Sequence, residues 1–303
     1  MTTSLVRRLL GGVLAVLLVS GVAGAQTPTP TDIAALRVDA DAGDASSQSL
    51  LGYYYSTGQG VPQDDAQAAS WCRQAAEQGY ADAQYNLGFM YDTGRGVPQD
   101  YVEAVAWYRQ AAEQGHAIAQ YNLGAMYRTG QGVPQDDAQA VAWHRQAAEQ
   151  GYAAAQSNLG AMYAAGQGVP QDYAQAVTWY RQAAEQGNAA AQYNLGLMYA
   201  AGQGVPQDYA QAVTWSRQAA EQGLANAQYN LGFMYYTGKG VPQDFVEAHK
   251  WSNLAASRAS AENQAEYAEI RDALAEKMTP TQIEAAQTLA REWLAAFEKR
   301  GGK

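Results

Sequence analysis

Apolar residues recur along much of this chain at the spacing of a single helix face. Segment 80–115 holds two stripes of this kind, one formed by Ala83, Leu87 and Tyr91 and the other by Ala104, Trp107 and Ala111. Steps of three and four residues place the members of each stripe on the same side of an α-helix. The pattern therefore predicts two amphipathic helices within this segment.

Turn-forming and capping residues separate the two stripes. Gly94, Gly96 and Pro98 are expected to end the first helix and to redirect the chain. Asp100 is the expected N-cap of the second helix, and Glu103, three residues later, would complete a capping box. The segment therefore predicts a helix hairpin.

This hairpin pattern returns every 36 residues along the chain. The tetrapeptide Val-Pro-Gln-Asp begins at Val61, Val97, Val133, Val169, Val205 and Val241. A fixed period of this length is typical of solenoids, in which each repeat buries its apolar face by stacking on its neighbours. The sequence therefore predicts an all-α solenoid of six repeats.

Three further residue types occur once per repeat and indicate how the helices pack. They are glycines inside the first helix (Gly52, Gly88, Gly124, Gly160, Gly196, Gly232), glutamines four positions earlier (Gln48, Gln84, Gln120, Gln156, Gln192, Gln228) and tryptophans of the second helix (Trp71, Trp107, Trp143, Trp179, Trp215, Trp251). Glycine inside a helix costs about 1 kcal/mol relative to alanine, so its repetition predicts close helix contact. The glutamines and tryptophans are likewise expected to serve packing.

The repeat resembles the Sel1-like repeat, a relative of the tetratricopeptide repeat. The resemblance is carried by A-x-A-Q-x-x-L-G-x-M-Y-x-x-G-x-G-V-x-x-D followed by A-x-x-W-x-x-x-A-A-E-Q-G, and it covers residues 44–259. It implies a right-handed superhelical solenoid of antiparallel helix pairs that assembles protein complexes, usually without catalysis. It also implies that the first helix of each pair lines a concave surface on which a peptide would lie.

Both ends of the chain differ from the repeats. A pair of arginines, an apolar run over residues 9–19 and a small-residue site ending at Ala25 predict a cleavable signal peptide over residues 1–25. The alternative, an uncleaved anchor, is disfavoured because the run is short for a span of roughly 20 residues. The mature protein is thus expected in the periplasm or outside the cell. Residues 26–43 are interpreted as a linker and N-terminal capping helix, and residues 260–303 as C-terminal capping helices.

Charge and cysteine content limit the classes of partner. The chain has 19 lysines and arginines against 29 aspartates and glutamates, and loss of the two arginines of the signal would change its net charge from −10 to 17 − 29 = −12. Such a chain is not expected to bind nucleic acid, or to insert stably into a membrane after signal cleavage. Cys72 is the single cysteine, so the disulfides and β-lactam chemistry associated with cysteine-rich Sel1-like proteins are not carried over.

Candidate catalytic and metal-binding groups do not converge in the sequence. His116, His144 and His249 occupy three different positions of the repeat, so a structural or solvent-facing role is expected for each. The glycines of T-G-x-G-V-P lack the lysine of a phosphate-binding loop. Aspartates fall mainly in turns and caps, which makes paired carboxylates for acid–base chemistry the weaker hypothesis. We expect no catalytic residue, metal or cofactor.

One stripe of the first helix varies between repeats while its neighbours stay constant. Its positions are the third, sixth, tenth and thirteenth of the repeat, which share one helix face. The expected partner-binding residues, named here the variable stripe, are Tyr53, Asp82, Tyr85, Phe89, Asp92, Tyr121, Arg128, Tyr193, Leu197, Tyr229, Phe233 and Tyr236. Exposed aromatic residues are typical of binding surfaces, which favours recognition over neutral drift of a solvated face. The fourth repeat has only alanine and serine at these positions and would separate two contact patches.

A second variable row runs along the second helix. Its members are Asp65, Cys72, Tyr101, Tyr108, Asp137, His144, Tyr173 and Tyr180. Polar residues alternate with aromatic ones at matching positions, which predicts a convex and mostly solvated face. Cys72 would be weakly reactive there if it were exposed.

These features favour a non-catalytic scaffold or adaptor of the cell envelope that binds a peptide or protein partner on its concave surface. Two alternatives remain. An envelope hydrolase or β-lactam-binding protein would need convergent carboxylates, or a nucleophile beside a base. A glycan-binding module would use the same aromatic stripe, with tyrosine rings lying flat and open and amides beside them.

Overall fold

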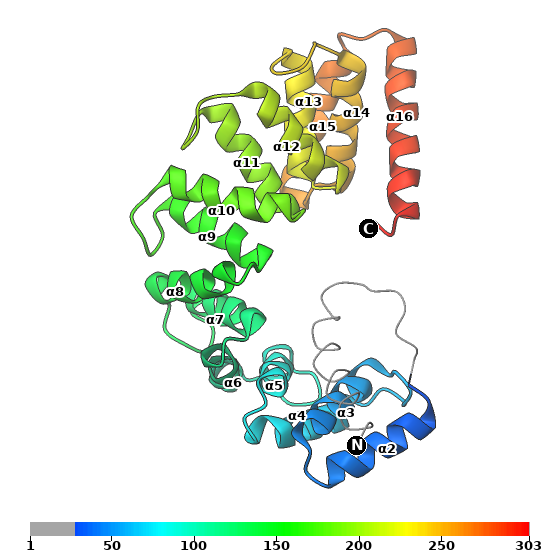
Figure 1. The fold of residues 1–303 in the computed structure, drawn as a ribbon. Coiled ribbons are helices and arrows are strands. Elements are labelled where there is room, and N and C mark those ends of the chain that lie inside the picture. Colours follow the sequence, from blue (N-terminus) through cyan, green and yellow to red (C-terminus); the bar gives the residue numbers. More distant parts are fainter. Residues whose placement is uncertain (1–27, 303) are drawn as a thin grey trace, which may run out of the picture. The chain divides into compact units, whose positions relative to one another are not determined.

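The computed structural model describes residues 28–302, and these form fifteen α-helices and no strand (Figure 1). The expected signal peptide lies outside the described residues. The chain divides into two compact parts, which meet in the sequence between Gln150 and Gly151 and are described separately below.

The first compact part contains seven of the described helices. They are α2 (Pro30–Asp41), α3 (Ala45–Thr57), α4 (Asp65–Glu77), α5 (Ala81–Thr93), α6 (Tyr101–Glu113), α7 (Ala117–Thr129) and α8 (Asp137–Glu149). The second compact part contains the other eight. They are α9 (Ala153–Ala165), α10 (Tyr173–Glu185), α11 (Ala189–Ala201), α12 (Tyr209–Glu221), α13 (Ala225–Thr237), α14 (Phe245–Arg258), α15 (Ala261–Ala275) and α16 (Pro280–Lys299).

Each repeat is a helix hairpin, as predicted, and α5 with α6 shows why. Gly94 and Gly96 both adopt φ +72°, a left-handed conformation that ends α5 and turns the chain. The Asp100 amide then donates to the Tyr91 carbonyl at 2.9 Å, which closes the turn. The Asp100 carboxylate accepts bonds from the backbone amides that open α6, including that of Glu103. The predicted N-cap is therefore confirmed.

The reciprocal half of the capping box predicted at Asp100 and Glu103 is not formed, and the same is true at Asp64 and Gln67 of α4. There the Gln67 side chain donates to the Asp64 carboxylate at 2.9 Å rather than accepting a bond from the Asp64 amide. A neutral amide beside a carboxylate makes the stronger, charge-assisted bond in this orientation. Complete capping boxes occur instead at α2, through Thr29, and at α16, through Thr279.

The glycine inside each first helix meets a side chain of its partner helix, as the close-contact prediction required. A Cβ added at Gly88 would lie 2.8 Å from the Tyr108 ring, and one added at Gly124 would lie 2.9 Å from the His144 ring. Real Cβ atoms do not approach other heavy atoms so closely. The absence of a side chain therefore lets the two helices of a pair come together around a ring.

This contact shows that the prediction of a solvated second row is wrong for half of its members. The side chains that cover the glycines are at most 3% exposed, and they are Cys72, Tyr108, His144 and Tyr180. The remaining members, at the start of the second helices, are partly buried. The core stripe of α6 accordingly runs through Ala104, Tyr108 and Ala111. Trp107 is only partly buried and packs at the edge of the core.

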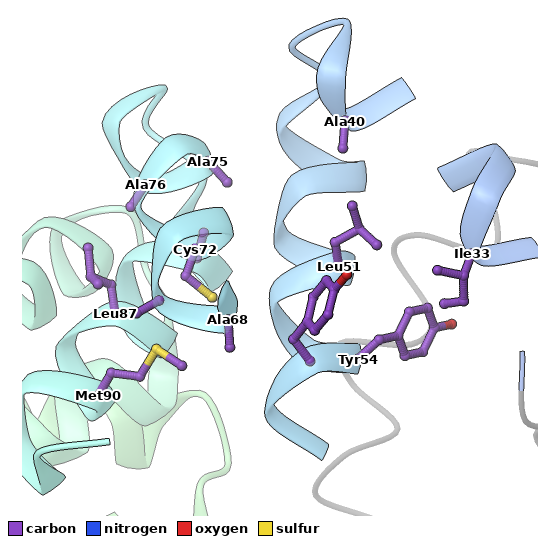
Figure 2. Packing of buried hydrophobic residues seen from close by; sticks show 13 residues of the cluster. Ile33, Ala40, Leu51, Tyr54, Ala68, Cys72, Ala75, Ala76, Leu87 and Met90 are labelled. Carbon is purple, nitrogen blue, oxygen red and sulfur yellow. The ribbon is translucent and has the colours of Figure 1, made fainter. Parts of the chain in front are cut away.

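Apolar packing continues through each compact part. Around α3 to α5, Leu51, Cys72 and Leu87 are almost fully buried within one cluster (Figure 2). At the other end of the chain, Trp251 is buried and meets Trp293 of α16 edge to face, with ring centroids 5.9 Å apart. Among the six repeat tryptophans Trp251 alone is fully buried, so most of them supply the border of the core rather than its centre.

The repeated glutamines link neighbouring helices, which confirms their packing role. The buried Gln84 amide donates to the Ala76 carbonyl of α4 at 3.2 Å and to Gln110 of α6 at 3.1 Å. Its Oε1 accepts from Gln114 at 2.7 Å. The same three bonds recur around Gln120 and Gln192. Because a buried amide must keep its hydrogen bonds, each glutamine fixes its helix between two others.

Substituting Gly88 with alanine tests the close helix contact. Alanine has the higher helix propensity by about 1 kcal/mol, so a loosely packed site would be stabilised. We expect instead a net loss of about 1–3 kcal/mol, because the added methyl group overlaps the Tyr108 ring. Urea unfolding followed by circular dichroism measures the change. In a Tyr108→Ala background the same glycine substitution should become neutral or stabilising, and an equal loss in both backgrounds would contradict the packing described.

A second prediction concerns the buried His144, whose two ring nitrogens have no hydrogen-bond partner among the described residues. Burial, together with the smaller effect of the Arg128 charge, lowers the pKa of His144 to about 4. The unfolded chain therefore binds more protons between about pH 6.5 and pH 4, so stability should fall as pH decreases through this window. His144→Tyr introduces the residue found in the equivalent place at Tyr108 and Tyr180. Urea midpoints measured across this window should fall less steeply for the variant, and parallel curves would show that His144 does not contribute.

Candidate functional site

The variable stripe lies on the face of the first helices that the repeats leave open. In α5 the residues Ala83, Leu87 and Met90 are buried in the core. Five large apolar side chains are exposed in the described part of the chain, namely Val38, Phe89, Val102, Leu197 and Phe233. Phe89, Leu197 and Phe233, which are 38%, 37% and 47% exposed, all occupy the tenth position of their repeats. Exposed apolar side chains thus recur at one position of the predicted stripe.

A pocket of about 280 Å³ opens along this face in the first compact part. Its walls come from α3, α4, α5, the turn after α5 and the start of α7. The side chains that shape it include Tyr53, Asp82, Tyr85, Phe89, Arg95 and His116. Four of these six belong to the variable stripe. The structure therefore brings together residues of two first helices that the sequence places 36 positions apart.

Tyr85 and His116 both line this pocket. Their rings stack with centroids 4.7 Å apart, and Tyr85 also stacks on Tyr108 at 5.9 Å. The His116 Nδ1 accepts from the Ala119 amide at 3.1 Å as the N-cap of α7, so Nε2 carries the proton. That atom lies 3.5 Å from the Asp82 carboxylate. His116 therefore has a structural role, holding Tyr85 and Asp82 in place.

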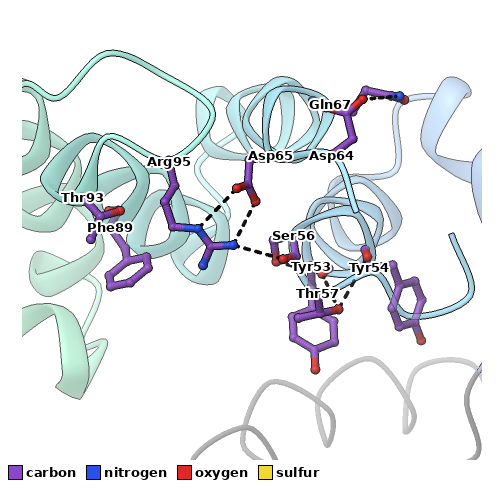
Figure 3. A network of polar contacts seen from close by, with 10 residues as sticks. All are labelled: Tyr53, Tyr54, Ser56, Thr57, Asp64, Asp65, Gln67, Phe89, Thr93 and Arg95. Carbon is purple, nitrogen blue, oxygen red and sulfur yellow. Dashed lines mark hydrogen bonds and ion pairs between the residues drawn. The ribbon is translucent and has the colours of Figure 1, made fainter. Parts of the chain in front are cut away.

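Arg95 lies at the opposite edge of the pocket. Its guanidinium pairs with the Asp65 carboxylate at 2.9 Å and donates to the Ser56 carbonyl at 3.1 Å (Figure 3). In the same view, the Phe89 ring lies near Arg95, and the Tyr53 ring projects from α3. The Tyr53 hydroxyl accepts from the Gln59 amide at 3.0 Å. The positive charge of Arg95 is thus already neutralised within the chain.

Asp92, at the end of the stripe on α5, is partly buried. It accepts a long hydrogen bond of 3.4 Å from the Tyr108 hydroxyl. Burial raises the pKa of Asp92 above its ordinary value, against the smaller opposing effect of that bond. On α7, the Tyr121 ring lies against His144 at 5.4 Å and Arg128 is exposed. On α5 the two aromatic residues of the stripe therefore lie between two acidic ones, whereas α7 has one aromatic and one basic residue.

The pocket does not supply an activated nucleophile. Cys72 forms part of its wall, yet the side chain is 1% exposed, and burial raises the pKa of the thiol to about 12. Reactive cysteines need the opposite, a thiol whose pKa is lowered by a neighbouring positive charge. Within residues 28–302 no three histidine, cysteine or acidic side chains are grouped so that they could hold a metal ion.

The stripe of the second compact part differs between its repeats. In the fourth repeat, Ser157 is buried and the remaining positions are alanines. Tyr193 and Leu197 of α11 contribute larger side chains, and burial raises the pKa of Tyr193. In the sixth repeat, Tyr229, Phe233 and Tyr236 line a second pocket of about 240 Å³.

Helix α15 covers part of the stripe in the sixth repeat, a contact that sequence reasoning missed. The Tyr267 ring stacks on Tyr229 with centroids 4.4 Å apart and an interplanar angle of 9°. The Lys277 ammonium donates to the Tyr236 hydroxyl and lies 4.8 Å from the centre of its ring. One signal was available in the sequence, since α15 starts 36 residues after α13. It therefore takes the place of a seventh first helix.

Comparison with solved structures identifies similar proteins. A Sel1 repeat protein from Oxalobacter formigenes is 33% identical, with a TM-score of 0.69 over 81% of this chain and 96% of its own. A protective antigen of uropathogenic Escherichia coli, described as having an SLR fold, is 28% identical over 95% of this chain and 86% of its own, with a TM-score of 0.49. A comparison with curated proteins finds no match.

The family comparison finds six repeats with the same 36-residue period. The family model described as Sel1 repeat matches residues 45–80, 81–116, 117–152, 153–188, 189–224 and 225–260. These segments are contiguous and each holds one helix hairpin. Proteins built from such repeats generally serve as protein-interaction scaffolds. The matched segments span more than half of the sequence, and the chain belongs to the Sel1 repeat family.

Proposed function

We propose that this protein is a non-catalytic interaction scaffold of the cell envelope and that its variable stripe binds a peptide or protein partner. The observation that carries the proposal is the exposure of Phe89, Leu197 and Phe233 at one position of the repeat. An apolar side chain at this position keeps more than a third of its surface in water, because the other face of its helix supplies the core. Partner binding would bury these side chains and gain roughly 25 cal/mol for each Å² of apolar surface removed from water.

The two alternative functions receive less support from the site. A hydrolase or β-lactam-binding protein needs a nucleophile beside a base, whereas burial keeps the Cys72 thiol protonated and His116 is engaged as a helix cap. A glycan-binding module needs tyrosine rings with open faces. The Tyr85 ring is stacked on His116 and Tyr108, and the Tyr229 ring is covered by Tyr267. These contacts leave the apolar tenth position as the best-supported binding feature.

The envelope location is part of the proposal and rests on the signal-like pattern that ends at Ala25. In the described residues, no helix combines the length and apolar character needed to cross a membrane. Mass spectrometry of the protein recovered from its native envelope should identify Gln26 as the first residue. An intact Met1 terminus in the membrane fraction would support an anchored protein instead.

The binding role is tested by truncating the exposed side chains of the stripe. A Phe89→Ala, Leu197→Ala, Phe233→Ala variant should lose more than tenfold of its partner recovery in quantitative affinity purification from the native envelope, because apolar anchors often contribute about 2 kcal/mol or more each. Val38→Ala with Val102→Ala is the matched control, since these exposed side chains lie outside the stripe.

Both variants must first show wild-type circular dichroism and urea midpoints, so that unfolding does not account for lost binding. The proposal requires the stripe variant to lose partners that the control retains. If both retain the wild-type partners, or if the control loses them, the stripe is not the binding surface.

A further inference from the structure

The contact between α15 and the sixth repeat shows what kind of segment the stripe accepts. Ile270, Leu274 and Lys277 follow one another at steps of four and three, so they share one side of their segment. All three line the 240 Å³ pocket, against Phe233 and Tyr236 of α13. The two apolar side chains thus share a pocket with Phe233 at the tenth position of the repeat, and the lysine contacts Tyr236 at the thirteenth.

Lys277 fits the thirteenth position because it meets the aromatic ring and the hydroxyl of Tyr236 there. The Lys277 ammonium lies 4.8 Å from the centre of the Tyr236 ring and donates to its hydroxyl. A cation over an aromatic face is stabilised by the negative potential of that face. The chain itself therefore places a cation, in the turn directly after α15, beside Tyr236 of this repeat.

The second repeat has the same positions without such a cover. Phe89 occupies the tenth position and is 38% exposed at the mouth of the 280 Å³ pocket. Asp92 occupies the thirteenth, where the sixth repeat has Tyr236. Among the described residues the Asp92 carboxylate pairs with no cation. It accepts the long hydrogen bond from the Tyr108 hydroxyl. A partly buried carboxylate in an apolar surrounding is stabilised when a cation approaches it.

A partner of the second repeat is expected to differ from α15 in net charge. Segment 260–278 has five acidic and two basic residues, a net charge of −3. Asp82 and Asp92 lie at the two ends of the stripe on α5, so they would repel a segment as acidic as this one. The whole chain, at −10, would attract a basic segment over longer distances.

We propose that the α5 part of the variable stripe binds a basic helical segment of a partner protein. Two apolar residues four positions apart contact Phe89, and a lysine or arginine one turn later pairs with Asp92. The inference rests on the proposed function and specifies the class of partner. Arg95 does not compete for Asp92, because its guanidinium is held by Asp65 and the Ser56 carbonyl.

The probe is a fluorescein-labelled peptide with the sequence of residues 260–278 in which its four glutamates and one aspartate are replaced by glutamine and asparagine. These replacements retain the apolar pair and both cations, so the net charge becomes +2. We expect it to bind the full chain in fluorescence anisotropy at about 50 mM salt, where screening is weak. The unaltered acidic peptide should bind at least tenfold more weakly.

Matched changes on both molecules test the pairing. Asp92→Asn in the protein and Lys277→Glu in the peptide should each weaken binding at least fivefold, and Phe89→Ala should do the same. Combining Asp92→Lys with the Lys277→Glu peptide should restore binding. The controls are Val102→Ala and Glu113→Gln, which remove an exposed apolar side chain and an exposed charge outside the stripe.

A photoreactive benzoylphenylalanine in place of Ile270 of the peptide locates the site. Crosslinks to α5 support the inference, and crosslinks confined to α13 would show that the peptide merely replaces α15. Binding that depends on Phe89 but is indifferent to Asp92 overturns the basic-segment inference while the proposed function stands. If the peptide does not bind, or binds unchanged to the Phe89→Ala variant, the inference is likewise wrong. The capture experiment above then decides the proposed function independently.

Discussion

The close contact between each first-helix glycine and the side chain opposite it is the constraint on which the helix pairs depend. At Gly88 the space that a Cβ would occupy is filled by the Tyr108 ring, and other repeats use a thiol or an imidazole for the same purpose. This approach brings two backbones together and fully buries Leu87 beside the contact. The opposite face of α5, where Phe89 lies, is then left partly exposed.

Repetition explains how much of this structure could be predicted. Local sequence patterns that recur in all six repeats predict the hairpin, the N-cap at Asp100 and the packing role of the glutamines. These patterns do not show which side of the second helix faces the core. A spacing of three and four residues from Ala104 to Ala111 can include either Trp107 or Tyr108. Polarity then favoured the wrong choice, since His144 at the equivalent position is polar and yet fully buried. The six copies predict a close contact at each glycine, but they do not show which side chain of the second helix meets it.

The candidate site shows the same division between local and long-range information. Exposure at Phe89, Leu197 and Phe233 follows from helix geometry once the core face is known. The cover on the sixth repeat depends on Tyr267 and Lys277, which lie on a polar helix outside the repeating pattern. Nothing in the local sequence specifies which ring they meet. Residues that repeat therefore form the scaffold, and the residues that differ give each repeat its own surface chemistry.

The hydrogen bonds of the repeated glutamines are incomplete in the sixth and last repeat. Gln228 donates to the Ala220 carbonyl at 3.1 Å, but its buried Oε1 has no partner in the described residues. Leu254 and Arg258 stand where the other repeats supply glutamines. An internal repeat carries both halves of this linkage, so duplicating it within the array would lengthen the protein and keep every bond. A copy of the sixth repeat would carry Leu254 and Arg258 with it and would lack this linkage, which makes duplication of internal repeats the route that the architecture favours.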